Sequence, residues 1–169
     1  MSGLPKLVNA VVGKIWAPNQ IMPRWLIEGI ATYSETKRSA GGRTRNSQFD
    51  MFLRVPTLDG TALRLDQVNA LPSMFPRGNV AYLYGSRFLR YIFDRFGDDT
   101  LRRMSHASGA NPLPFALNRQ IEGIVGETFP QLYDDWTAFR RDRYALQAQG
   151  LARRGARAGS QLTTSGESN

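Results

Sequence analysis

The chain has 169 residues, 41% of them hydrophobic and 21% charged, so it is long enough for one globular domain and too short for two. The absence of cysteine excludes disulfides, zinc ribbons and cysteine nucleophiles, and no apolar run approaches the about 20 residues of a membrane span. The net charge of +8 invites a nucleic-acid partner, but Lys and Arg are spread along the chain, which favours solvated faces and a basic tail instead.

The N-terminal quarter predicts one clear helix and a cationic loop, and its first segment is either a helix or a connector. Residues 4–16 are apolar and form a short helix or a buried connector, and residues 1–16 make a poor signal peptide, so the compartment stays open. After a turn at residues 17–20, we expect a helix from about Pro23 to Lys37. Proline is favoured at the start of a helix, because the first amide hydrogens of a helix have no partner within it. Gly, Arg, Thr and Ser at residues 39–46 then predict a flexible loop.

The strongest helix signal lies in the middle of the chain. Residues 49–55 are short and apolar and predict either a helical turn or a strand, and residues 62–76 contain prolines that prevent an assignment. Val80–Phe96 follows the capping residue Asn79, ends at Gly97, and is apolar over more than half of its circumference. We expect this helix to lie centrally in the core. Its polar side carries Ser86, Arg87, Arg90 and Asp94.

The C-terminal half predicts three more helices. Asp98 can cap one that ends at Met104, and a second is expected from about Leu113 to Ile121. Thr128 can cap a long helix from Phe129 to about Gln149. One face of that helix carries Leu132, Trp136 and Phe139.

We therefore predict a mainly α fold, with at most a small sheet contribution at residues 49–65. Residues 1–149 form its helical domain. From residue 150 the sequence changes to Gly, Ala, Arg, Ser and Thr without periodicity, which predicts a flexible basic tail over residues 150–169.

Glu28 is the most informative residue, because it places a carboxylate among apolar neighbours on the helix expected at residues 23–37. An ionised carboxylate in such surroundings costs several kcal/mol unless it is paired or bound to a cation. An arginine, a shared proton or a metal ion each satisfies this requirement, and the residues alone do not choose among them. The candidate arginines are Arg24, Arg87 and Arg90.

The segment around Glu28 resembles a known zinc-ligand helix. In the gluzincin metallopeptidases, the thermolysin-like and aminopeptidase-like families, one helix carries His-Glu-x-x-His and a second donates a glutamate from a pattern similar to Trp-Leu-x-Glu-Gly-x-Ala-x-Tyr-x-Glu. Its fixed positions are matched by Trp25, Leu26, Glu28, Gly29, Ala31, Tyr33 and Glu35. The small Gly29 and Ala31 permit the close helix approach that a zinc–carboxylate bond of about 2 Å requires.

The resemblance implies roles for individual residues. Glu28 resembles the zinc ligand, and Glu35 looks like the outer carboxylate that orients a ligand imidazole. Tyr82 and Tyr84 are candidate transition-state donors in a complete enzyme, with core packing as the alternative role. The parent domain would hydrolyse a peptide or protein substrate with a zinc cofactor.

The similarity extends over roughly residues 20 to 145, although only the Glu28 segment is specific. Residues 82–91 with 96–99 look like the next core helix of the family, and residues 115–136 fit its closing helices. In the tail, residues 161–167 look like the entry to a TolB-type β-propeller, which implies a propeller as a possible partner domain.

The sequence departs from the family at its other ligands. The chain contains a single histidine, His106, and no His-Glu-x-x-His, so it lacks two zinc ligands and the general base. We expect a truncated fragment of a peptidase domain in preference to a degenerate homologue. Such a fragment is inactive by itself, binds no zinc tightly and has no catalytic residue of its own. A parent of this type is often periplasmic or secreted.

Two other functions remain open. The chain can be a non-catalytic helical module that holds a partner, in which case Glu28 pairs with an arginine. It can also be a basic nucleic-acid binder, which salt-dependent affinity would reveal. Serine nucleophiles and phosphate loops are not supported, since neither Ser86 nor Ser105 has a Gly-x-Ser-x-Gly setting and Gly41-Gly42 lacks a P-loop pattern.

Overall fold

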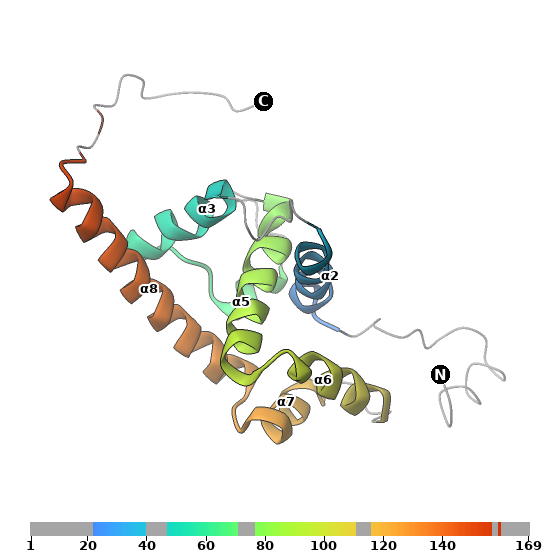
Figure 1. Ribbon diagram of the computed structural model, residues 1–169. Coiled ribbons are helices and arrows are strands. Elements are labelled where there is room, and N and C mark those ends of the chain that lie inside the picture. The colour runs from blue at the N-terminus through green and yellow to red at the C-terminus, as the bar shows by residue number, and fades with distance from the viewer. Residues whose placement is uncertain (1–21, 40–46, 71–76, 111–115, 157–158, 160–169) are drawn as a thin grey trace.

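The computed structural model describes residues 22–39, 47–70, 77–110, 116–156 and 159 (Figure 1). This part of the chain contains seven α-helices, one 3-10 turn at Arg77–Asn79 and no strand. The helices are α2 (Arg24–Arg38), α3 (Ser47–Leu58), α4 (Leu65–Asn69), α5 (Val80–Phe96), α6 (Asp99–Ala110), α7 (Leu117–Val125) and α8 (Phe129–Arg153). The prediction of a mainly α fold is confirmed, and the segment left open between helix and strand at residues 49–55 is helical.

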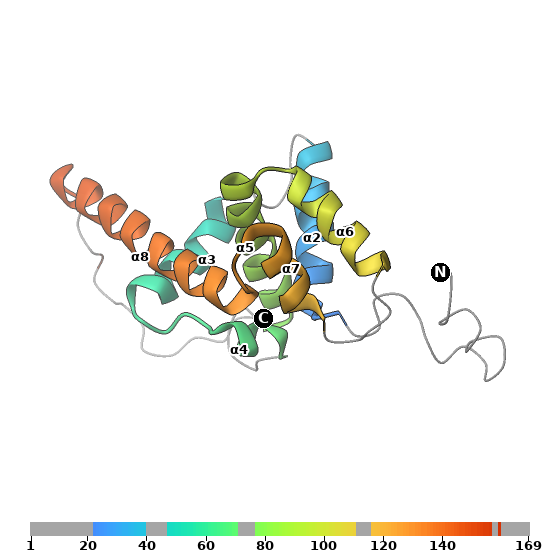
Figure 2. The same ribbon diagram turned by 90° about the horizontal axis from the view of Figure 1, so that it is seen from below.

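Helix α5 is central, as its apolar circumference predicts. Helix α2 packs along one side of α5, and α3 and α8 lie on the other side (Figures 1 and 2). The helix ends where expected, at Gly97, whose φ of 89° suits glycine and whose N–H donates to the Phe93 carbonyl. Asn79 occupies the N-cap position, but its side chain makes no capping hydrogen bond.

The polar side expected for α5 is partly wrong. Ser86 is fully buried, and its hydroxyl donates to the Leu83 carbonyl at 3.3 Å, which satisfies the polar group inside the core. Arg87 is also mostly buried, whereas Arg90 and Asp94 are exposed as predicted. A serine hydroxyl that donates to a carbonyl of its own helix can be buried against a neighbouring helix. A charged side chain cannot satisfy its charge in this way.

Two glycines allow α2 and α5 to cross at close range. A Cβ atom on Gly29 would lie 2.6 Å from the backbone carbon of Gly85, and a Cβ on Gly85 would lie 2.1 Å from the Trp25 carbonyl oxygen. Both distances are far below van der Waals contact, so neither position accepts a side chain without moving a helix. Gly29 therefore packs closely against α5, which is not the zinc-ligand helix for which the sequence pattern predicts small residues on α2.

An aromatic cluster fills the core between α2, α5 and α8. Phe88 of α5 is at its centre, with the ring centroids of Trp25, Tyr133 and Trp136 at 5.4, 5.1 and 5.4 Å. Phe129, at the start of α8, stands edge-on to Trp25 at 5.1 Å. Tilted and edge-on pairs at these separations contribute beyond their buried area.

The ends of α6, α7 and α8 agree only in part with the expected ones. Helix α6 continues six residues past Met104, so His106 lies within a helix and is exposed. Helix α7 begins at Leu117, and the expected start at Leu113 lies outside the described residues. Helix α8 begins after Thr128 as predicted and continues to Arg153, into the segment assigned to the tail.

Several sequence predictions fall outside the described residues. They are the helix and turn at residues 4–20, most of the loop at 39–46, and the propeller-like segment at 161–167. Within the described part of the chain, no helix is both long enough and apolar enough to cross a membrane.

Candidate functional site

Glu28 lies on α2 at the edge of the surface that packs against α5. The buried side of α2 consists of Trp25, Leu26, Gly29, Thr32, Tyr33 and Thr36. Glu28 borders this buried side without belonging to it, and its side chain is 25% exposed. Its neighbours on the outward side, Ile27 and Ala31, are exposed as well. The carboxylate is therefore less buried than the apolar neighbours suggested, because those neighbours face α5 and Glu28 does not.

Arg24 is the cation that the structure places beside Glu28. One carboxylate oxygen of Glu28 lies 3.8 Å from Arg24 Nε, one helical turn away, and the Arg24 side chain is itself 40% exposed. An ion pair at this distance between two partly exposed groups is weak, worth about 0–1 kcal/mol. Because this ion pair is weak, a metal ion can displace Arg24 from Glu28. When no metal is bound, Arg24 offsets part of the negative charge of Glu28.

The other candidate site residues do not gather around Glu28. Glu35 is exposed two turns further along α2, about 10 Å up the helix axis. Tyr84 is buried on the α8 side of α5, where its hydroxyl accepts a hydrogen bond from the Leu63 N–H at 3.4 Å and burial raises its pKa. Tyr82 is half-buried on α5. Across the described residues, no three His, Cys, Asp or Glu side chains converge as a metal site would require.

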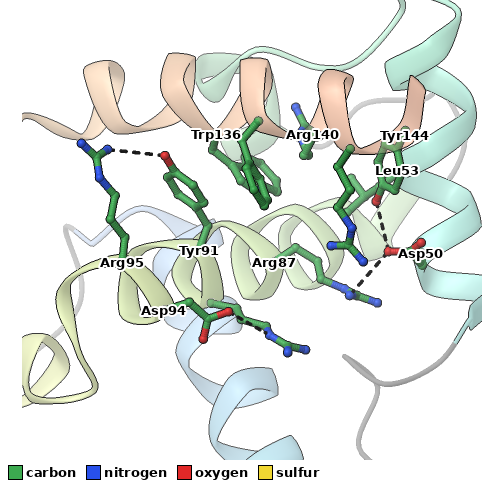
Figure 3. Close-up of a pocket in the computed structure, with 12 residues that line it drawn as sticks. Asp50, Leu53, Arg87, Tyr91, Asp94, Arg95, Trp136, Arg140 and Tyr144 are labelled. Carbon is green, nitrogen blue, oxygen red and sulfur yellow. Dashed lines mark hydrogen bonds and ion pairs between the residues drawn. The ribbon is translucent and has the colours of Figure 1, made fainter. Parts of the chain in front are cut away.

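A pocket of about 320 Å³ lies between α3, α5 and α8, and no residue of α2 lines it (Figure 3). Its apolar lining includes Leu53, Trp136 and Phe139. Its charged lining consists of Asp50, Arg87, Arg90, Asp94, Arg95, Arg140 and Arg143. Five guanidinium groups and two carboxylates therefore line one pocket. They come from helices far apart in the chain, so the sequence does not predict that they lie together.

Asp50 is the acidic centre of this pocket. One of its oxygens lies 3.6 Å from Arg87 Nη1 and accepts a hydrogen bond from the Tyr144 hydroxyl at 3.1 Å (Figure 3). The side chains of Asp50 and Arg87 are only 19% and 12% exposed. Burial is the main cause that raises the pKa of Tyr144 to about 12, and the negative charge of Asp50 is the second. Tyr144 therefore remains a neutral donor to the carboxylate at physiological pH.

Burial also lowers the pKa of Arg87, and the nearby cations Arg90 and Arg143 act in the same direction. Asp50 and Tyr144 oppose this effect. The pKa of Arg87 is thus lowered mainly because burial disfavours its charge, and Asp50 offsets only part of this effect.

Arg140 is the least expected residue of the pocket lining, since it is only 3% exposed. Its guanidinium lies 3.8 Å from the ring centre of Trp136, and Nη2 donates to the Thr137 hydroxyl at 3.1 Å. Its Nε and Nη1 are buried without a hydrogen-bond partner. Burial lowers its pKa. The cation–π contact with Trp136 takes the place of an ion pair with a carboxylate. This contact is weaker than a well-formed buried ion pair.

The sequence prediction missed this arrangement at one position. Leu132 and Trp136 are buried as expected, but the third residue predicted on that face, Phe139, is 50% exposed, and Arg140 is buried in its place. Arg140 follows Trp136 by four residues, as Trp136 follows Leu132, so the same face continues through it. The four-residue spacing indicates that position 140 is buried, but an arginine is not expected in a core.

Comparisons of this chain with protein-family models, with curated proteins and with solved structures each found no match.

Proposed function

We propose that this chain is the glutamate-bearing helical part of a gluzincin-like zinc peptidase domain, in which Glu28 is one zinc ligand. The observation that carries the proposal is the match of residues 25–35 to the family pattern at each fixed position. The geometry is compatible with it. Glu28 is partly exposed, its ion pair with Arg24 is long, and the adjacent Ala31 is small and exposed, so a further helix can approach this side of α2.

The donor set of the chain fits one position of such a zinc site. Zinc in catalytic sites takes three protein ligands, and the two imidazoles would come from a helix that carries His-Glu-x-x-His, which the 169 residues do not contain. When bound, zinc supplies a Lewis acid that polarises the peptide carbonyl and activates water. The contribution of this chain is limited to the Glu28 carboxylate, with Glu35 in the outer position that orients an imidazole. The substrate would be a peptide or protein.

The coding sequence directly upstream of the Met1 codon tests this proposal. We expect an in-frame His-Glu-x-x-His there, and the longer product should bind one zinc ion per chain. Glu35→Gln should weaken zinc binding by about 10–100-fold and Glu28→Gln by more, because outer partners contribute that much and ligands more. Glu122→Gln, an exposed carboxylate on α7, is the matched control and should leave zinc affinity unchanged. The absence of the motif upstream would contradict the proposal.

A non-catalytic helical module is the second candidate, and the Arg24–Glu28 contact favours it. In that case Glu28 is a helix-surface carboxylate whose charge Arg24 offsets at 3.8 Å. Elemental analysis of the longer product separates the two functions. Stoichiometric zinc that disappears in Glu28→Gln supports the peptidase domain, and a folded product without zinc supports the module.

A further inference from the structure

The pocket between α3, α5 and α8 has an excess of positive charge that its own carboxylates do not offset. Asp50 is shared by Arg87 and the Tyr144 hydroxyl, and Asp94 lies 3.3 Å from Arg90. Arg95 binds Glu127 and Asp135 outside the lining. Among the described residues, Arg140 and Arg143 have no ion pair with a carboxylate. Arg140 is buried, whereas Arg143 is exposed, so an anion that enters this space can approach Arg143 without displacing a carboxylate from it.

The position of Arg87 strengthens this point. Its side chain is largely buried, and Arg90 and Arg143 repel its charge while Asp50 attracts it. A single added negative charge near Arg87 and Arg143 would relieve that repulsion and accept charge-assisted hydrogen bonds. A dianion such as phosphate is disfavoured, because Asp50 lies 3.6 Å from the same guanidinium and would repel it.

The other walls of the pocket are apolar and aromatic. Trp136 and Phe139 of α8 and Tyr91 of α5 line it, and the rings of Tyr91 and Phe139 are 5.4 Å apart. Phe139 is half exposed although it is a large aromatic residue, so a ligand can cover it. The volume of about 320 Å³ is at the small end of ligand pockets and accommodates a molecule the size of one amino acid.

We propose that this pocket binds a small organic carboxylate that carries an apolar or aromatic group. The carboxylate lies between Arg87 and Arg143, and the apolar group lies against Trp136 and Phe139. The pocket is lined by α3, α5 and α8 and by no residue of α2, so Glu28 is not part of this site (Figure 3).

Calorimetric titration of the full chain at low salt tests the proposal with three probes. N-acetyl-phenylalanine has the ring and the carboxylate, its amide has the ring without the charge, and inorganic phosphate has the charge without the ring. We expect saturable binding of the acid below about 10 mM, and binding of the amide and of phosphate at least about tenfold weaker. Nuclear magnetic resonance should show the indole N–H signal of Trp136 shifting with the acid.

Arg143→Gln is the informative variant, because Arg143 is exposed and its replacement leaves the core unchanged. It should weaken binding of the acid about tenfold or more, as expected for loss of one charged hydrogen bond. Arg141→Gln removes the same charge from the same helix outside the pocket lining and should leave the affinity unchanged. The proposal is overturned if the acid does not saturate, if the amide or phosphate binds equally well, or if the two variants behave alike.

Discussion

Gly29 and Gly85 face each other where α2 crosses α5, with so little space that a Cβ on either would enter the backbone of the other helix. This contact fixes the position of α2, and therefore of Glu28, relative to the core. It also sets which side of α2 stays outward. Two residues that carry no functional group therefore help to set the orientation of Glu28, together with the other buried residues of α2.

The first prediction concerns this crossing. Gly85→Ala should lower the free energy of unfolding by about 1–3 kcal/mol, since the added methyl group would lie 2.1 Å from the Trp25 carbonyl oxygen and force the helices apart. Gly123→Ala is the control, because that glycine is also helical and has open space around it. It should raise stability by about 0.5–1 kcal/mol. Urea unfolding measures both, and equal effects would contradict the close crossing.

A second prediction concerns Glu28 itself. Glu28→Gln should change the free energy of unfolding of this chain by no more than about 1 kcal/mol, because its contact with Arg24 is long and partly solvated. Circular dichroism during urea unfolding gives the value. A larger loss would show that the carboxylate has a structural role, and the contact with Arg24 would then be stronger than its geometry indicates.

The third prediction is the absence of peptidase activity in the chain of 169 residues. It has one histidine, His106, which is exposed on α6, so two imidazole ligands and the general base are missing. Fluorogenic peptide substrates with added zinc should give no turnover above that of zinc alone. Zinc-dependent cleavage that Glu28→Gln abolishes would overturn this prediction.

The fourth prediction concerns Arg140. Arg140→Met keeps the long stem against Trp136 and removes a buried charge that lacks an acidic partner, so stability should stay equal or rise by about 1–2 kcal/mol. Arg140→Ala removes the stem too and should lower stability by about 2 kcal/mol or more. Thermal and urea unfolding of the pair give the comparison. A loss in Arg140→Met as large as in Arg140→Ala would mean that the charge itself stabilises the core.

The fifth prediction concerns alkaline pH. The pKa of Tyr144 is raised from 10.0 to about 12, mainly by burial, so the folded protein keeps this phenol neutral where the unfolded chain ionises. The stability that results is fully present below pH 10 and is lost as the pH rises toward 12. Tyr144→Phe removes the titrating group, and its stability should therefore fall less steeply over this range. Urea unfolding at a series of pH values measures the slopes, and equal slopes would contradict the raised pKa.

The sequence determined most of the helices. Periodicity, with Gly97 as a stop and Thr128 as a start, gave α5 its limits and α8 its beginning, because these signals act within a few residues of the backbone they terminate. The pattern around Glu28 likewise gave the candidate ligand and the expectation of a small contact residue at Gly29. The expected end of α6 at Met104 is wrong, since the residues after Met104 contain no strong breaker until Gly109 and the helix continues to Ala110.

Only the tertiary structure decided what those helices bring together. It placed Glu28 beside Arg24 and partly in solvent, buried Arg140 where Phe139 was expected, and gathered Asp50, Arg87 and Arg143 from three helices into one pocket. Residue spacing defines the face of a single helix, but the partner of that face depends on how helices far apart in the chain pack. The charge on each side of α5 is therefore a property of the packing and cannot be read from any one segment.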